Sequence, residues 1–218
     1  MYSDNWSKQF LIEKLQNFDS AKEIINAGEN FVTVKRKEGI DFSGFVMSLT
    51  EINYQTVKEI CDKYTNLNFI VNIKKQYNLS GECISYLISK NISFGGLGDF
   101  MRFCNQKSNK LIEDKDYSFV SRNLKQHDKV ISIERIDNRR IRIMRKGLPE
   151  VIAIMINDYD ITAESIRFAK ELYKDFRVVI KTNPNGSITS GAEQIGETLN
   201  IDICKWGIFL GKLNSKWI

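Results

Sequence analysis

Apolar residues along the chain switch repeatedly between the spacing of helices and the spacing of strands. Residues 7–26 carry them at helical intervals, which predicts an opening helix or helix pair. The elements predicted after it in the first half are strands at 30–37 and 45–49, a helix at 56–64, a strand at 68–74, a helix from 80 to 90 and a strand at 92–94. Helices that alternate with strands indicate an α/β protein.

The second half repeats this order of elements. The predictions are strands at 130–136, 139–145 and 151–156, a helix at 162–174, a strand at 178–180, a helix from 190, a strand at 201–203 and a terminal helix. The run 151–156 is apolar throughout, which is typical of a strand buried on both faces, so we expect it at the centre of a sheet. A further helix is predicted at 119–125, between the halves.

Identical residues also recur at a constant separation of 109 positions. The pairs are Asn91 and Asn200, Ile92 and Ile201, Gly98 and Gly207, Phe100 and Phe209, and Asn105 and Asn214. Self-similarity at a fixed period is the signature of a repeated architecture. We therefore predict an internal tandem duplication of a β-β-α-β-α-β unit with pseudo-twofold symmetry. Its sheet or sheets are mixed or mostly parallel, with right-handed crossovers.

The duplication divides the chain into four predicted segments. They are an N-terminal helical segment at 1–28, a first α/β repeat at 29–106, a connecting segment at 107–128 and a second α/β repeat at 129–218. Only two prolines occur, and no Ser/Gly-rich tract separates the halves. A long flexible linker is therefore not expected.

Composition places the chain among ordinary folded proteins, with 42% hydrophobic and 27% charged residues. Its four cysteines lack the paired spacing of zinc or redox sites, so we expect reduced, mostly buried thiols. Charges interrupt the first apolar run, which argues against a secretory signal. No apolar run is long enough to span a bilayer, and we expect a cytoplasmic protein without membrane contact.

Acidic residues follow the predicted central strand of the second half. Asp158 and Asp160 stand at the carboxyl end of that strand, and Glu164 lies in the next helix. Ligands collect at this edge of parallel sheets, and two nearby carboxylates are suitable ligands for Mg²⁺. The three residues are candidate catalytic residues, with Asp158 and Asp160 as candidate metal ligands. The alternative is a polar loop in which Asp160 or Thr162 caps the helix.

The run DYDITAESI resembles, over about ten residues, the acidic motif of topoisomerase-primase (Toprim) domains. In that family two aspartates at a strand end precede a helix, and the resemblance implies metal-dependent chemistry on nucleic acid. The chain has Ala163 where the family has glycine, and its first half has Thr50 and Ile52 at the places of the aspartates. The element order also allows comparison with PD-(D/E)XK nucleases, but the ligand residues of those enzymes are missing.

Basic residues concentrate on two predicted strands, while the formal net charge is only +5. The candidate phosphate-binding residues are Arg139, Arg140, Arg142 and Arg145 in the second half and Lys35 and Lys37 in the first. Alternation with isoleucine places Arg140 and Arg142 on one face of their strand, where they could grip nucleic acid. The other interpretation is a solvated outer strand whose charges discourage edge pairing.

Three further features have competing interpretations. The glycines of FGGLGDF, residues 94–100, fit either a backbone approach to phosphate or a tight turn from strand to helix, and we favour the turn. Ser80 and Ser190 fit helix N-caps better than nucleophiles, because the chain has a single histidine. Trp217 is a candidate anchor for a partner.

These observations favour a non-enzymatic cytoplasmic binding protein that recognises a macromolecular partner, with a protein more expected than nucleic acid. An immunity or inhibitor protein and an assembly component both fit this description, and no cofactor is predicted. One alternative is a metal-dependent nucleic-acid-processing enzyme that uses Asp158, Asp160, Glu164 and Mg²⁺. The other is a non-catalytic nucleic-acid binder that uses the basic strands. The oligomeric state is left open.

Overall fold

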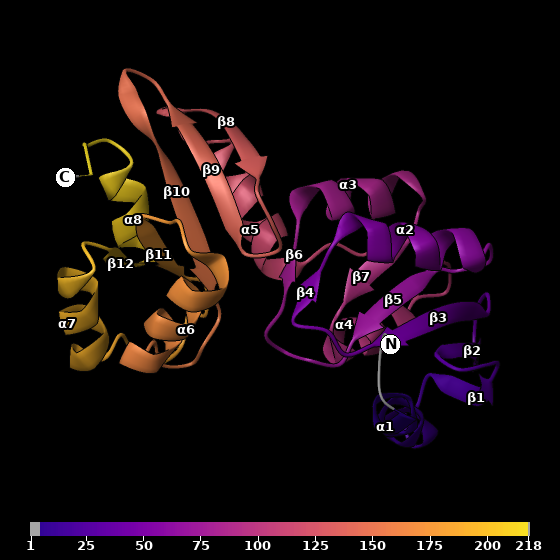
Figure 1. The fold of residues 1–218 in the computed structure, drawn as a ribbon. Coiled ribbons are helices and arrows are strands. Elements are labelled where there is room, and N and C mark those ends of the chain that lie inside the picture. The colour runs from indigo at the N-terminus through magenta and orange to yellow at the C-terminus, as the bar shows by residue number, and fades with distance from the viewer. Residues whose placement is uncertain (1–4, 218) are drawn as a thin grey trace. The chain divides into compact units, whose positions relative to one another are not determined.

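The computed structural model describes residues 5–217. The chain divides into two compact units, with unit 1 ending at Asp114 and unit 2 beginning at Lys115. Each unit has its own five-stranded sheet with helices around it (Figure 1). The predicted α/β class with mixed sheets is confirmed. Residues 1–4 of the predicted N-terminal segment and residue 218 of the predicted second repeat lie outside the described residues.

Unit 1 begins with a helix that precedes three antiparallel strands. Its elements are α1 (Asn5–Gln16), β1 (Ala21–Asn26), β2 (Phe31–Arg36), β3 (Phe42–Met47), β4 (Glu51–Ile52), α2 (Tyr54–Lys63), β5 (Phe69–Asn72), β6 (Asn78–Leu79), α3 (Gly81–Ser89), β7 (Ser93–Gly95) and α4 (Leu97–Cys104). The sheet order is β1-β2-β3-β5-β7, antiparallel from β1 to β3 and parallel from β3 to β7. The short strands β4 and β6 pair in parallel in a separate sheet.

Apart from β4 and β6, whose place is taken by a single bridge between Ile161 and Ile188, unit 2 has the same succession of elements and the same strand directions. Its elements are α5 (Lys115–Leu124), β8 (Val130–Arg135), β9 (Arg140–Arg145), β10 (Leu148–Ile156), α6 (Ala163–Tyr173), β11 (Val178–Lys181), α7 (Ser190–Thr198), β12 (Asp202–Lys205) and α8 (Trp206–Lys212). The sheet order is β8-β9-β10-β11-β12, antiparallel from β8 to β10 and parallel from β10 to β12. β10 is central, as predicted. The origin of this likeness by duplication, and a twofold relation, stay predictions.

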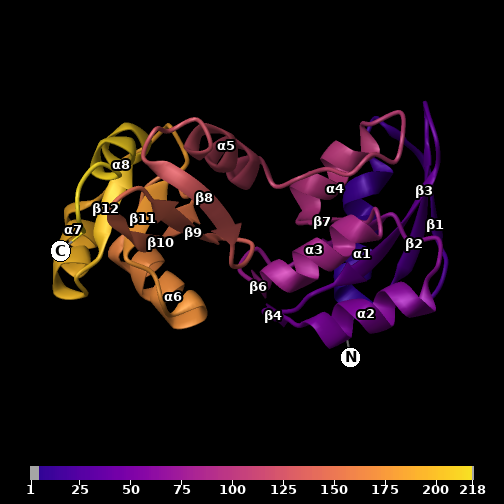
Figure 2. The same cartoon turned by 90° about the horizontal axis from the view of Figure 1, so that it is seen from above.

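Helices cover both faces of each sheet and bury one core on each face. In unit 2, α6 and α7 pack on one face of the sheet through residues such as Ile166 and Ala192, and α5 and α8 pack on the other through Val120 and Phe209 (Figure 2). Unit 1 has the same layers, with α2 and α3 on one face and α1 and α4 on the other. Each unit therefore buries apolar surface on both faces of its own sheet.

The opening segment differs from its prediction. The helix ends at Gln16, and residues 21–26, predicted as helix, form strand β1. A turn closes between Phe18 and Ala21, after which β1 pairs with β2 and Ile24 lies opposite Val34. Short apolar segments fit both spacings, and here pairing with β2 satisfies the backbone groups of the segment. The segment predicted at 1–28 contains α1 and β1 of unit 1, and the segment predicted at 107–128 crosses the boundary between the units and contains α5 of unit 2.

The repeated Asn-Ile pairs mark equivalent helix ends. Asn91 and Asn200 follow α3 and α7 in the left-handed conformation, with φ of 56° and 54°. The next residues, Ile92 and Ile201, donate their backbone N–H groups back to the carbonyls of Leu87 and Gly196, at 2.9 and 2.7 Å. These bonds complete a Schellman termination, in which a left-handed residue such as asparagine reverses the chain.

The predicted helix caps are partly correct. Ser80 is the N-cap of α3, and its side chain accepts from the Cys83 N–H at 3.2 Å. The N-cap of α7 is Thr189, while Ser190 is the first helical residue, so the prediction for Ser190 was wrong by one position. The Thr189 hydroxyl accepts from the Ala192 N–H at 3.2 Å, so Thr189 caps the helix in place of Ser190.

Cys61, Cys83, Cys104 and Cys204 are free thiols, and all except the half-buried Cys61 are buried, as expected. Within residues 5–217, no helix combines the length and the apolar character needed to cross a membrane.

Candidate functional site

The acidic residues singled out in the sequence lie in two adjoining loops at the carboxyl edge of the unit 2 sheet. The first loop, residues 157–161, follows β10, and the second, residues 182–188, follows β11. The loops meet at a parallel bridge between Ile161 and Ile188. We call residues 157–161 the acidic loop. Its position is the one at which parallel α/β sheets present ligand-binding residues.

Lys181, the last residue of β11, forms hydrogen bonds to the backbone of both loops. Its side chain is only 3% exposed, and its ammonium donates to the carbonyl oxygens of Asp158 at 2.9 Å, Asn183 at 3.0 Å and Asn185 at 2.6 Å. These three acceptors match the three donors of the group. Burial lowers the pKa of Lys181, against the opposite influence of Asp160. The acidic loop therefore has a fixed backbone next to a buried cation.

The two aspartates accept hydrogen bonds from serines, one in α6 and one in the second loop. The Asp158 carboxylate accepts from the Ser165 hydroxyl at 2.7 Å, and Asp160 Oδ1 accepts from the Ser187 hydroxyl at 2.8 Å and from the Ser187 N–H at 2.7 Å. The hydrogen bonds from the side chain and backbone of Ser187 lower the pKa of Asp160. Both carboxylates thus shape the loops by binding neutral donors.

A glycine allows the two loops to touch. Gly186 has φ of 74°, and a Cβ atom on it would lie 1.8 Å from the Tyr159 carbonyl oxygen. Any other residue would force the loops apart. Tyr159 itself points outward, and with 66% of its surface exposed it is the most exposed large apolar residue described. A rigid backbone thus presents an aromatic ring to solvent between two carboxylates.

Glu164 takes a different position from the aspartates. It is exposed in the first turn of α6, whose N-cap is Thr162, as one of the sequence interpretations proposed. The Thr162 hydroxyl accepts from the Ser165 N–H at 3.1 Å. In the described part of the chain, no group of three or more His, Cys, Asp or Glu side chains is placed to hold a metal ion. The catalytic and metal roles of these residues stay predictions.

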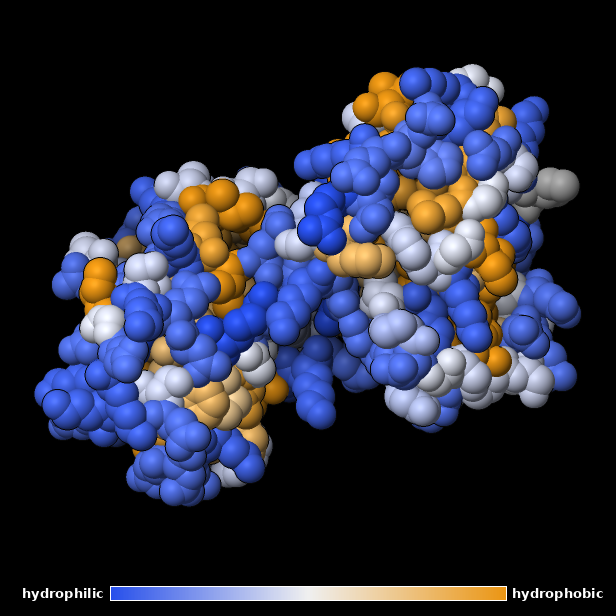
Figure 3. All heavy atoms as spheres, turned by 180° about the vertical axis from the view of Figure 1, so that it is seen from behind, coloured by the Kyte–Doolittle hydropathy of each residue, from blue (hydrophilic) through white to orange (hydrophobic). Residues whose placement is uncertain are grey.

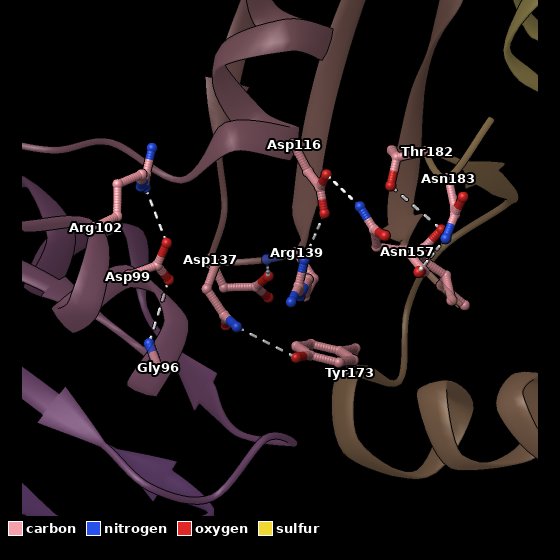
Figure 4. Close-up of polar contacts among 12 residues, drawn as sticks. Gly96, Asp99, Arg102, Asp116, Asp137, Arg139, Asn157, Tyr173, Thr182 and Asn183 are labelled. Atoms are coloured by element: carbon pink, nitrogen blue, oxygen red, sulfur yellow. Dashed lines mark hydrogen bonds and ion pairs between the residues drawn. The ribbon is translucent and has the colours of Figure 1, made fainter. Parts of the chain in front are cut away.

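A polar network that the sequence did not indicate lies beside the acidic loop (Figure 4). Asp116 of α5 accepts from the Asn157 amide at 2.5 Å and pairs with Arg139 at 3.2 Å. Asn183 donates to the Asn157 carbonyl at 3.3 Å, and Asn138 donates to the Tyr173 hydroxyl at 3.4 Å. The sequence signal for this network was position: Asn157 directly follows β10, and Asn183 comes two residues after the end of β11.

Most of the basic candidates bind acidic or carbonyl groups of their own unit. Arg139 pairs with Asp116, and Arg140 pairs with Asp137 at 2.7 Å. Arg142 pairs with Glu134 and Glu150, and Lys35 pairs with Glu23 at 2.7 Å. Lys37 is exposed. Their predicted contacts with phosphate stay predictions. The alternative interpretation as outer strands was wrong, because β9 lies between β8 and β10, and β2 lies between β1 and β3.

Arg145 has a different environment from the other basic residues. It is 4% exposed, and its guanidinium donates to the carbonyl oxygens of Pro149, Leu213 and Ser215. It also lies over the half-buried Trp217 ring, 4.5 Å from the ring centroid. Trp217 packs against the core under α5 and α8. Both candidate binding residues therefore hold the chain that follows α8, and their binding roles stay predictions.

At the corresponding edge of unit 1, the bridge between Ile161 and Ile188 matches the pairing of Ile52 with Leu79, 109 positions earlier. The places of Asp158 and Asp160 are therefore held by Leu49 and Glu51, not by Thr50 and Ile52 as expected, and only one of them is a carboxylate.

The glycine-rich turn of unit 1 leads into α4, and the Asp99 carboxylate accepts from the Gly96 N–H at 3.3 Å and pairs with Arg102 at 2.8 Å (Figure 4). A Cβ atom on Gly95 would lie 2.5 Å from the Asp99 side chain. The turn thus supplies its own anion at the helix N-terminus, as the interpretation of a tight turn requires.

Comparison of the chain with protein-family models, with curated proteins and with solved structures finds no match.

Proposed function

We propose that the chain is a non-enzymatic binding protein whose acidic loop recognises a protein partner. The observation that carries this proposal is Tyr159, 66% exposed on a loop that Lys181, Ser165 and Ser187 hold in place. Tyrosine is over-represented among the residues that dominate binding energy at protein interfaces. A preorganised loop also loses little conformational entropy on binding, so more of the contact energy appears as affinity.

The charges around Tyr159 support a partner with a basic surface. Tyr159 is flanked in the sequence by Asp158 and Asp160, and Glu164 follows in α6. Within the described residues none of these three carboxylates takes part in an ion pair. Complementary charge steers association and selects among partners. Both aspartates accept hydrogen bonds from serine. This supports a role in recognition more than a role in binding Mg²⁺.

Affinity purification of the tagged full chain from its native cells tests this function. We expect wild type to retain a stoichiometric protein partner, and Tyr159→Ala to retain at least about tenfold less of it, as loss of an interface hot spot does. Ile131→Ala is the matched control, because Ile131 is 63% exposed on β8 and should leave retention unchanged. Equal retention by Tyr159→Ala, or no protein partner at all, would contradict the proposal.

A further inference from the structure

A second surface feature of unit 2 carries charge opposite to that of the acidic loop. Phe119 of α5 is 38% exposed and lies 5.1 Å, between ring centroids, from the half-buried Trp206 at the start of α8. Lys115, one turn before Phe119, and Lys205, next to Trp206, are exposed. We call these four residues the basic seat. Figure 3 views unit 2 from the side that α5 and α8 cover, where apolar atoms break the polar surface.

The acidic loop and the basic seat share the same edge of one sheet. Asn157, the first residue of the acidic loop, donates to Asp116, the neighbour of Lys115. Lys181 holds the carbonyl of Asp158 and lies opposite Lys205 in the pairing of β11 with β12. The carboxyl edge of unit 2 is therefore one continuous surface with an acidic part and a basic aromatic part.

These opposite charges remain unpaired within one copy. Across residues 5–217, no ion pair includes Asp158, Asp160, Glu164, Lys115 or Lys205. A surface with adjacent parts of opposite charge is self-complementary under a twofold rotation, because each part then faces its opposite. Each acidic loop would meet the basic seat of the other copy, and every contact would occur twice.

We propose, building on the proposed function, that the partner of the acidic loop is a second copy of this chain, bound through the carboxyl edge of unit 2. In the twofold dimer, Tyr159 of each copy packs against the Phe119 and Trp206 rings of the other. Asp158 and Glu164 face Lys115 and Lys205. Aromatic contacts of this kind add to the energy of burial, and the charges fix the orientation.

The same surface is poorly suited to nucleic acid. Asp158 and Asp160 of the acidic loop and Glu164 of α6 repel phosphate. The Trp206 ring is already in contact with Phe119 and Phe209, at 5.1 and 5.7 Å between centroids. A base needs an open ring face for stacking. A tyrosine side chain, in contrast, can pack against the exposed edge of the pair.

Sedimentation velocity of the full chain, from about 1 μM to about 1 mM, tests the dimer. We expect reversible dimerisation that weakens as salt is raised, because screening reduces the contribution of exposed charges. Two charge-reversed variants are informative. The loop variant combines Asp158→Lys in the acidic loop with Glu164→Lys in α6, and the seat variant combines Lys115→Glu with Lys205→Glu. Each alone should be monomeric, since like charges then face each other, and an equimolar mixture of the two should form a heterodimer.

Controls keep the result independent of folding. The loop variant retains Asp160 and its bonds to Ser187, and Tyr159→Ala removes the ring without removing a side-chain hydrogen bond. Tyr159→Ala should weaken the dimer at least about tenfold. Lys146→Glu with Glu193→Lys changes the same kinds of exposed charge elsewhere and should leave dimerisation unchanged.

The possible outcomes separate this inference from the proposed function. Wild type that stays monomeric at every concentration overturns the second-copy inference, as does a seat variant that still dimerises or a mixture that fails to associate. If wild type is monomeric but retains a different protein through Tyr159, the proposed function stands and this inference falls. A monomer that retains no protein overturns both, and a shift of wild type with single-stranded RNA in place of dimerisation also overturns this inference.

Discussion

Equivalent positions in the two units hold their loops with different side chains. Asn72 ends β5, and its amide donates to the carbonyls of Leu49 at 3.0 Å and Lys74 at 3.1 Å. Lys181 ends β11 and donates to the carbonyls of Asp158 and Asn183, which stand 109 positions after Leu49 and Lys74. The hydrogen bonds to these carbonyls recur, but the donor is a neutral amide in unit 1 and a buried ammonium in unit 2.

The bond from Ser187 to Asp160 should set the acid sensitivity of the acidic loop. Because the folded pKa of Asp160 lies below its ordinary value of 3.8, its contribution to stability is present above that value and is lost as pH falls through the folded pKa. Ser187→Ala removes the hydroxyl donor, so we expect the pKa of Asp160 to rise toward 3.8. Carboxyl chemical shifts followed by NMR during acid titration measure this change.

Ser165→Ala is the matched control for this titration, since it removes the hydroxyl bonded to Asp158 and leaves the Ser187 bonds in place. An unchanged Asp160 pKa in Ser187→Ala would contradict the role of this hydrogen bond.

At this scale the sequence identified the acidic residues but not their partners. Asp158 and Asp160 stood out because they follow an apolar strand at the edge where parallel sheets collect ligands. Ser187 is 27 positions from Asp160 and carries no signal of its own. Arg145 is the opposite example. Its place in a basic cluster suggested a phosphate ligand, but Arg145 is an odd number of positions from Arg142 and shares the buried face of β9 with Ile141 and Ile143.

Among the elements, the last helix of each unit is fastened by a buried arginine from the second strand of its sheet. Arg36 of β2 donates to the carbonyls of Phe103 at 2.8 Å and Cys104 at 3.1 Å, at the end of α4. Arg145 of β9 donates to the carbonyls of Leu213 at 3.2 Å and Ser215 at 2.6 Å, after α8. The planar guanidinium satisfies several carbonyls that a helix end leaves without partners.

Replacing this arginine should cost much of the stability of its unit. Arg145→Met leaves buried carbonyls without donors, and we expect the free energy of unfolding to fall by about 2–4 kcal/mol. Arg142→Met on the same strand is the control. It removes an exposed ion pair, which is worth at most about 1 kcal/mol. Urea unfolding followed by circular dichroism measures both, and equal losses in the two variants would contradict the anchoring role.

The elements themselves were partly predictable. The helices predicted at 56–64 and 162–174 correspond to α2 and α6, because long amphipathic segments carry a clear period. Residues 21–26 were predicted as helix but form β1. A short apolar segment fits either period until a neighbouring strand is available to pair with it.

For the whole molecule, the division after Asp114 predicts two units that fold separately. Each has a complete sheet and cores on both faces, so we expect residues 1–114 and residues 115–218, expressed alone, to give dispersed NMR spectra and cooperative unfolding. A matched cut after residue 128 strips α5 from unit 2 and exposes the core that Val120 and Leu124 cover. Residues 129–218 should therefore fail to fold, and an equally stable shorter fragment would contradict the boundary.

The sequence indicated two similar halves, and the limits predicted for the repeats stay predictions. The predicted second repeat begins at residue 129, whereas the second compact unit begins at Lys115. The helix α5 belongs with it through buried contacts of Val120 and Leu124, and those contacts become visible only when the sheet is in place.

The arginine anchors have a consequence for biosynthesis. Arg36 finds its carbonyl partners 67 and 68 residues later in the chain, and Arg145 finds two of its partners after 68 and 70. A ribosome therefore has to release nearly all of a unit before that unit can close its last helix. Both of these partners of Arg36 lie within the first unit. The nascent chain can thus complete one unit before the next begins, which limits mispairing between two halves that have the same strand order.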